Sequence, residues 1–285
     1  MWGPVAQDGL FFTTNAEDIL INGADPGIPY IIGTTSYEGS QYKSDRQFSR
    51  TTIRSELFGN NDPFGETTLP PISQESFQEA ASQYLTKFHP DEFDNSDFEK
   101  LSTKDLNILA GYVYGDRSYA LPSWTMAQLY AEKNATVHHY VVDVSPAYDV
   151  ILNEEPDFPG CGHKMDLFYL FGKPVTLEYK ITLKNIVLKK WEQSLSFELM
   201  KLYTSFAHDG KVHTKEWLPF SNEISSYFHI SNNDTSIITS MKTDPMDSLL
   251  YWDSTINPGS FTYRDSSNNG GISKIKCYNY VIIML

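Results

Sequence analysis

The chain has 285 residues, a formal net charge of −14 and 40% hydrophobic residues. This hydrophobic content is typical of a globular protein and excludes general disorder. The acidic balance disfavours nucleic acids and anionic membrane surfaces as partners, and no stretch of about 18 apolar residues predicts a transmembrane span.

The first 72 residues predict one short strand within irregular chain. The strand is Tyr30–Gly33, which is apolar and follows a turn-rich approach over 25–29. Residues 41–72 are polar and contain glycine and proline, so they predict an irregular surface segment. Residues 1–9 contain neither a basic nor an apolar region, which predicts no signal peptide and leaves the cellular location open.

The next part of the chain predicts three helices and a strand. Ser73 begins a helical pattern, a second helix covers 103–114, and a third covers 122–133. Gly115-Asp116 is expected to separate the second helix from the third. Residues 136–144 are β-branched and aromatic and predict a strand, which a loop connects to residue 162.

The C-terminal part predicts the longest helix, over 188–207, followed by a strand pair over 227–230 and 236–241. A further helix is expected over 245–252, and residues 256–285 predict a disordered or atypical tail. Strands that alternate with amphipathic helices predict an α/β architecture, with a mainly parallel sheet flanked by helices.

Two loops that follow predicted strands carry the residues of greatest chemical interest. Residues 31–40 read Ile-Ile-Gly-Thr-Thr-Ser-Tyr-Glu-Gly-Ser and place Glu38 after the first strand. Residues 160–172 read Gly-Cys-Gly-His-Lys-Met-Asp-Leu-Phe-Tyr-Leu-Phe-Gly and place His163 where glycines permit a tight turn. From the residue pattern alone, Glu38 is more commonly a surface carboxylate, and His163 is more commonly a loop residue that makes a structural hydrogen bond.

Further segments occur in a recognisable order along the chain. They are Gly3-Pro4-Val5 with Asp8-Gly9, Gly115-Asp116 followed by Pro122, and Thr204–Gly210 followed by Trp217-Leu218-Pro219. Together with the two loops, they resemble the type-B carboxylesterase and cholinesterase family over residues 3–255. The resemblance implies a partial α/β-hydrolase fold, with residues 1–255 as the C-terminal half of the family's domain.

The resemblance also implies that Glu38 and His163 are the acid and the general base of a serine hydrolase. In such a site the carboxylate orients the imidazole, which takes the proton of the serine hydroxyl. α/β-Hydrolases carry serine, acid and histidine in this order along the chain, and Glu38 precedes His163 by 125 residues. Two positions depart from the family pattern: Lys164 replaces a small residue and Tyr37 replaces an acid or polar residue.

The nucleophile of such a hydrolase is missing from the sequence. A nucleophile elbow requires Gly-x-Ser-x-Gly, and the single Gly-x-Ser triplet, Gly271-Ile272-Ser273, is followed by Ile275 at the closing position. The glycine-rich oxyanion loop is missing too. We therefore expect a carboxylic ester hydrolase fragment that is inactive alone and acts on small carboxylic esters only when an N-terminal half completes it. The alternative is a non-catalytic interaction protein like the cholinesterase-like adhesion molecules.

Other polar residues have simpler explanations. His208, Asp209 and His213 are better explained as adjacent polar residues than as a metal site. Cys161 lacks a base-bearing context for a nucleophile, and its pairing with Cys277 stays open. No cofactor or metal is predicted, and the oligomeric state stays open.

Overall fold

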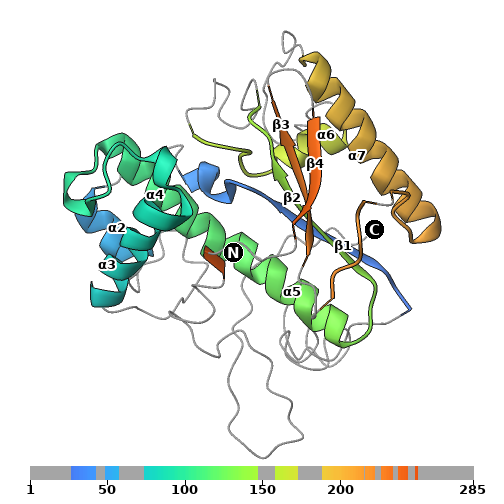
Figure 1. The fold of residues 1–285 in the computed structure, drawn as a ribbon, viewed down its shortest axis with the longest axis horizontal. Coiled ribbons are helices and arrows are strands. Elements are labelled where there is room, and N and C mark those ends of the chain that lie inside the picture. Colours follow the sequence, from blue (N-terminus) through green and yellow to red (C-terminus); the bar gives the residue numbers. More distant parts are fainter. Residues whose placement is uncertain are drawn as a thin grey trace, which may run out of the picture.

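The structure, a computed structural model, describes residues 27–42, 49–57, 74–146, 158–172, 188–214, 216–221, 226–233, 237–242 and 248–249. A four-stranded sheet runs through its centre in the order β1 (Tyr30–Thr35), β2 (Val137–Asp143), β3 (Tyr227–Asn232) and β4 (Ile237–Lys242) (Figure 1). β1, β2 and β3 are parallel, and β4 is antiparallel to β3. The predicted α/β architecture with a mainly parallel sheet is confirmed.

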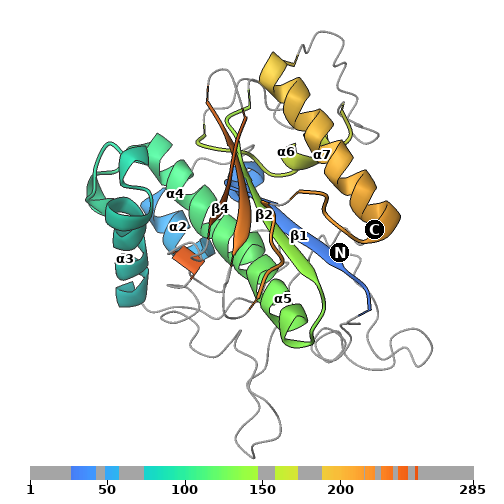
Figure 2. The ribbon, with the colours of Figure 1, turned by 45° about the vertical axis from the view of Figure 1, so that its right-hand side comes forward.

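Helices cover both faces of this sheet. α5 (Leu121–Glu132) lies along one face, and α6 (Met165–Leu170) and α7 (Lys190–Asp209) lie along the other (Figures 1 and 2). α2 (Arg50–Leu57), α3 (Gln74–Gln83) and α4 (Thr103–Gly115) gather at the left of Figure 1. Short helical turns cover Glu38–Tyr42, Tyr84–Phe88, Pro90–Glu92, Phe98–Lys100 and Asp116–Ala120.

Alternate side chains of β2 belong to two separate cores, as expected for a strand buried on both faces. Val137 and Val141 pack in the core formed with α4 and α5. Tyr140 and Val142 pack in the core formed with α6 and α7. The strand is therefore held between two helix layers.

The adjacent residues His138 and His139 follow the same alternation. The His138 ring contacts Trp217 at a centroid distance of 5.6 Å, and the His139 ring contacts Trp124 at 5.7 Å. Burial lowers the pKa of His138 to about 4 and that of His139 to about 3. Both imidazoles are therefore neutral at neutral pH, and they lie on opposite faces of the sheet.

Most of the predicted elements that fall on described residues are confirmed. The strand at Tyr30 extends two residues further than predicted, to Thr35, and the longest helix begins two residues later than predicted, at Lys190. The predicted helix over 245–252 is described only at residues 248–249. The predicted tail, and with it the boundary at residue 255, lies outside the described residues.

The interpretation of residues 41–72 as wholly irregular is wrong, because α2 lies within this segment. Ser49 begins the helix, since its backbone N–H donates to Thr52 Oγ1 at 2.8 Å and its hydroxyl accepts from the Thr52 N–H at 3.2 Å. Ile53 is fully buried and joins the core around α4. The segment is polar apart from a few scattered apolar residues, and such a pattern is too weak to predict a helix.

The expected helix break at Gly115-Asp116 is also wrong. Gly115 has helical dihedral angles (φ −59°, ψ −48°), and a π-helical turn over Asp116–Ala120 joins α4 to α5. A Cβ atom at residue 115 would lie 2.9 Å from the backbone nitrogen of Gly39 and 3.3 Å from Cβ of Glu38. The glycine therefore permits a close approach between α4 and the loop that carries Glu38.

Gly39→Ala tests this close approach from the other side. A Cβ atom at residue 39 would collide with the backbone carbonyl oxygen of Gly111 in α4, which cannot rotate away. We expect the free energy of unfolding to fall by about 1–3 kcal/mol, measured by urea unfolding. Glu79→Ala, at an exposed position of α3, is the control and should change it by less than about 0.5 kcal/mol. An unaffected Gly39→Ala variant would contradict the described packing.

Asp116 gives the stability of the fold a pH dependence. Burial raises its pKa to about 6, against the effect of hydrogen bonds with Tyr84 and Ser248. Between about pH 4 and pH 6 the folded protein therefore binds more protons than the unfolded chain, and its free energy of unfolding falls as the pH rises. Asp116→Asn removes this loss.

The measurement is the difference in free energy of unfolding between Asp116→Asn and the unmodified chain. This difference should increase by roughly 2–3 kcal/mol, in favour of the variant, between about pH 4 and about pH 7. A change in the free energy of unfolding that the amide causes equally at both pH values cancels when the two differences are compared. A difference independent of pH would show that the carboxyl group titrates alike in the folded and unfolded states.

Candidate active site

Glu38 lies three residues after the end of β1, at the start of a short helical turn. Its Oε1 atom accepts a hydrogen bond of 2.6 Å from the backbone N–H of Thr35. The residue is 7% exposed. The carboxylate is therefore buried and fixed to the last residue of the strand.

His163 lies in the loop before α6, and hydrogen bonds join this loop to the one that carries Glu38. The Tyr37 N–H donates to the Cys161 carbonyl oxygen at 2.9 Å, and the Cys161 N–H donates to Ser36 Oγ at 2.9 Å. The backbone N–H of His163 itself donates to Ser40 Oγ at 2.7 Å. These bonds fix the position of the histidine backbone relative to Glu38.

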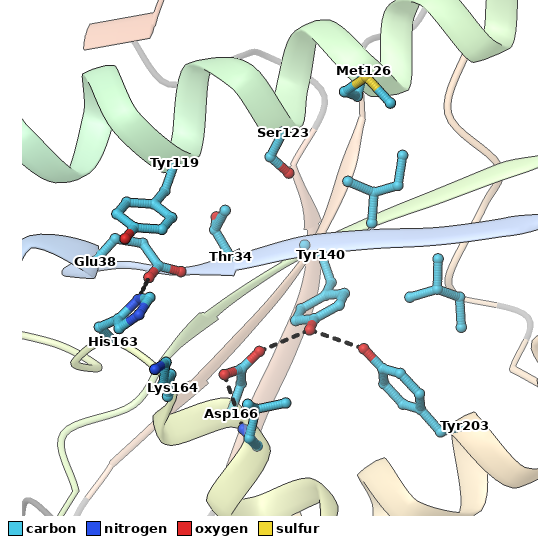
Figure 3. Close-up of a pocket in the computed structure, with 14 residues that line it drawn as sticks. Thr34, Glu38, Tyr119, Ser123, Met126, Tyr140, His163, Lys164, Asp166 and Tyr203 are labelled. Atoms are coloured by element: carbon cyan, nitrogen blue, oxygen red, sulfur yellow. Dashed lines mark hydrogen bonds and ion pairs between the residues drawn. The ribbon is translucent and has the colours of Figure 1, made fainter. Parts of the chain in front are cut away.

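The structure brings the two predicted site residues into direct contact. His163 Nδ1 lies 2.6 Å from Glu38 Oε2, and each side chain is 8% exposed (Figure 3). Because a carboxylate oxygen only accepts, Nδ1 carries a hydrogen, and in the neutral imidazole the lone pair is then at Nε2. A histidine held in this tautomer can accept a proton at Nε2, while the carboxylate stabilises the resulting cation.

The histidine loop depends on two residues with left-handed backbone conformations. Gly160 has φ +70°, and a Cβ atom there would collide with Ser36 Oγ. Lys164 has φ +64°, a region that glycine adopts at least cost. Because Lys164 carries a Cβ atom, it accepts a backbone strain here that only glycine would avoid.

Tyr37 anchors the acid loop to α4. Its side chain is 1% exposed and stacks on Phe158 at a centroid distance of 5.2 Å, and its hydroxyl donates to the Ile108 carbonyl oxygen at 3.1 Å. A Cβ atom at Gly111 would collide with this hydroxyl. Burial raises the pKa of Tyr37, so it is a neutral donor. This departure from the family pattern is therefore accommodated by packing.

A cavity of about 100 Å³ lies beside the histidine–glutamate pair. Its walls come from β1, from one face of α5, and from residues of β2, α6 and α7 on the opposite side (Figure 3). The Tyr119 ring of the helical turn before α5 lies 4.8 Å from the His163 ring. The other lining side chains that are used below are Ile31, Ile32, Ser123, Met126, Tyr140, Asp166, Leu167 and Tyr203.

A second carboxyl group, Asp166, lies in the same cavity. It accepts a hydrogen bond of 3.0 Å from the Tyr140 hydroxyl, which in turn accepts one of 2.9 Å from the Tyr203 hydroxyl. Burial, together with the negative charge of Glu38, raises the pKa of Asp166 to about 6. The sequence did not predict this series of hydrogen bonds. Its one signal in the sequence is the position of Asp166, three residues after His163, because the two tyrosines come from β2 and α7.

Another histidine–carboxylate pair connects β2 to β3 outside this cavity. His229 Nε2 lies 3.0 Å from Asp143 Oδ2. Burial acts to raise the pKa of Asp143, but hydrogen bonds with His229 and Ser36 outweigh it and lower the pKa. This pair therefore joins neighbouring strands through a hydrogen bond to the Asp143 carboxylate.

The remaining residues singled out in the sequence lie apart from this cavity where the structure describes them. His213 Nε2 lies 2.6 Å from Asp209 Oδ2 on the surface, and no group of three or more metal-ligating side chains occurs in the described part of the chain. Cys161 is a free, fully buried cysteine whose pKa burial raises, and Cys277 lies outside the described residues.

Comparison with known proteins agrees with this fold. The sequence model of the carboxylesterase family matches residues 1–249. The chain therefore belongs to the carboxylesterase family, whose members are carboxylic ester hydrolases of the α/β-hydrolase fold. A search of curated proteins found no match. Among the described helices, none is long and apolar enough to cross a membrane.

Proton NMR can test the bond between His163 and Glu38. A short hydrogen bond between an imidazole N–H and a carboxylate is charge-assisted, so the Nδ1 proton of His163 should resonate far downfield. Glu38→Gln replaces the carboxylate with a neutral amide and should move this signal upfield. Asp209→Asn is a matched control, since it alters an exposed pair of the same length and should leave the signal unchanged. A signal unaffected by Glu38→Gln would contradict the described pair.

Proposed function

We propose that Glu38 and His163 are the orienting acid and the general base of a serine carboxylic ester hydrolase. The observation that carries the proposal is the contact of 2.6 Å between His163 Nδ1 and Glu38 Oε2 at the wall of a cavity. The chain order of acid before histidine agrees with α/β-hydrolases. Membership of the carboxylesterase family supports the substrate class, a small carboxylic ester.

In the proposed reaction, His163 Nε2 accepts the proton of a serine hydroxyl while the serine oxygen attacks the ester carbonyl carbon. Collapse of the tetrahedral intermediate transfers that proton to the departing alcohol and leaves an acyl-serine. A water molecule then attacks the acyl group, again with proton transfer through Nε2, and the carboxylic acid leaves. Glu38 remains ionised throughout and stabilises the imidazolium form of His163.

In this proposal the serine comes from outside this sequence. The 285 residues contain no Gly-x-Ser-x-Gly segment, and within the described residues no serine hydroxyl hydrogen-bonds to the His163 imidazole. Ser123 lines the cavity, but its hydroxyl bonds to His139. We therefore propose that this chain turns over no ester by itself and that a segment with a nucleophile elbow completes it.

Hydrolysis of p-nitrophenyl acetate tests both parts of this proposal. The chain alone should hydrolyse the ester no faster than its His163→Ala variant, with or without a serine-directed organophosphate. When it is refolded together with the elbow-bearing N-terminal part of a carboxylesterase, turnover should appear and should fall by about 10²–10⁴-fold on His163→Ala. Organophosphate-sensitive turnover by the chain alone would disprove the missing nucleophile. Complemented turnover that survives His163→Ala would disprove the role of the histidine.

The missing nucleophile also motivates a second candidate, a non-catalytic interaction protein of the same family. Such a protein would bind a macromolecular partner saturably, and Glu38→Gln and His163→Ala would leave that binding unchanged. The two candidates are thus separated by the same pair of substitutions, because only the hydrolase requires them.

A further inference from the structure

A second polar pair lies at the wall formed by α5, and its serine lines the cavity. Ser123 Oγ lies 3.1 Å from His139 Nε2, and Ser123 shares the cavity with His163 (Figure 3). His139 is 3% exposed, and its Nδ1 atom has no hydrogen-bond partner among the described residues. The imidazole therefore forms one side-chain hydrogen bond, and that bond is to Ser123.

The protonation state of His139 determines what this serine can do. Burial lowers the pKa of His139 to about 3, so one ring nitrogen carries a hydrogen and the other carries a lone pair. A buried N–H without a partner is rarer in proteins than a buried acceptor without one. The Nε2–H tautomer leaves only a lone pair unsatisfied at Nδ1. In this tautomer Nε2–H donates to Ser123 Oγ, and the serine hydroxyl hydrogen needs another acceptor.

The position of Ser123 relative to His163 follows from the helix. Tyr119, which contacts the His163 ring, lies four residues before Ser123, so the two side chains are separated by about 6 Å along the helix axis. The cavity surface also includes the apolar side chains of Ile31, Met126 and Leu167. A ligand at His163 would thus meet apolar surface, and the Ser123 hydroxyl would lie about one helical turn away.

We propose that Ser123 is a specificity-determining residue, which donates a hydrogen bond to a second acceptor oxygen of an ester whose carbonyl group lies at His163. The preferred substrates are then short-chain esters with a keto or ether oxygen a few bonds from the ester carbonyl. The separation of about one helical turn between Tyr119, at the His163 ring, and Ser123 suits a second oxygen only a few bonds from the ester carbonyl. This inference rests on the proposed function, because it takes His163 as the place of the ester carbonyl.

Two esters of nearly the same shape test the inference. Methyl 4-oxopentanoate carries a second carbonyl oxygen, and methyl 4-methylpentanoate carries a methyl group in its place. Their dissociation constants can be measured on the whole chain from the ¹³C-methyl NMR signal of Met126, which lines the cavity. One neutral hydrogen bond predicts roughly three- to tenfold tighter binding of the keto ester.

Ser123→Ala should abolish this preference while leaving the affinity for methyl 4-methylpentanoate almost unchanged. Thr125→Val is the matched control, because the Thr125 hydroxyl lies on the same helix but donates to the Leu121 carbonyl oxygen at 2.9 Å and does not line the cavity. Thr125→Val should keep the preference. A merely structural role of Ser123 would change both affinities alike, so the ratio of the two affinities separates the roles.

Several results would overturn the inference. They are equal affinities in the unmodified chain, a preference that survives Ser123→Ala, no response of Met126 to either ester, and ¹⁵N NMR evidence that His139 carries its hydrogen at Nδ1. None of these measurements requires turnover. The proposed function is judged separately by the His163→Ala assay with p-nitrophenyl acetate, whose acetyl group has no second acceptor oxygen.

Discussion

The parallel pairing of β1 with β2 is the constraint on which the site depends. It runs from Tyr30 opposite Val137 to Thr35 opposite Val142, and parallel strands end at the same edge of a sheet. The loops that follow the two strands therefore begin side by side. If β1 and β2 were antiparallel, the loops that follow them, with Glu38 and His163, would begin at opposite ends of the strands. Three hydrogen bonds then hold the two loops together, and His163 Nδ1 lies 2.6 Å from Glu38 Oε2.

Contact between α4 and the acid loop supplies the second constraint. Gly39, Gly111 and Gly115 lie where the helix and the loop touch, and a Cβ atom at any of them would meet atoms of the other segment at 2.9 Å or less. This approach also explains why Gly115 lies inside a continuous helical segment. Because Glu38 lies between Tyr37 and Gly39, the position of the carboxylate depends on the packing on both sides of it.

The strands and the long helices could be predicted because their residue patterns repeat. α7 has an apolar stripe, and β2 is rich in β-branched and aromatic residues. The pairing of Glu38 with His163 needed chain order and family resemblance, because no local pattern relates residues 125 positions apart. The Ser123–His139 pair was not predictable at all, since it depends on how α5 lies against β2. Sequence patterns thus predict elements, whereas contacts between elements require the packed structure.

The edge of β1 that faces away from β2 bears on the proposal that a serine comes from another segment. The Tyr30 and Ser36 N–H groups donate to β2 or the residue before it, so the alternate groups of Ile31, Gly33 and Thr35 point away from β2. At Thr35 this outward N–H is taken by Oε1 of Glu38. The acid of the proposed triad thus caps the outer edge of the strand that lines the cavity. Among the described residues no strand pairs with this edge, so a serine-bearing segment that lay along it would reach the cavity beside His163, whose imidazole would take the serine proton while Glu38 stays ionised.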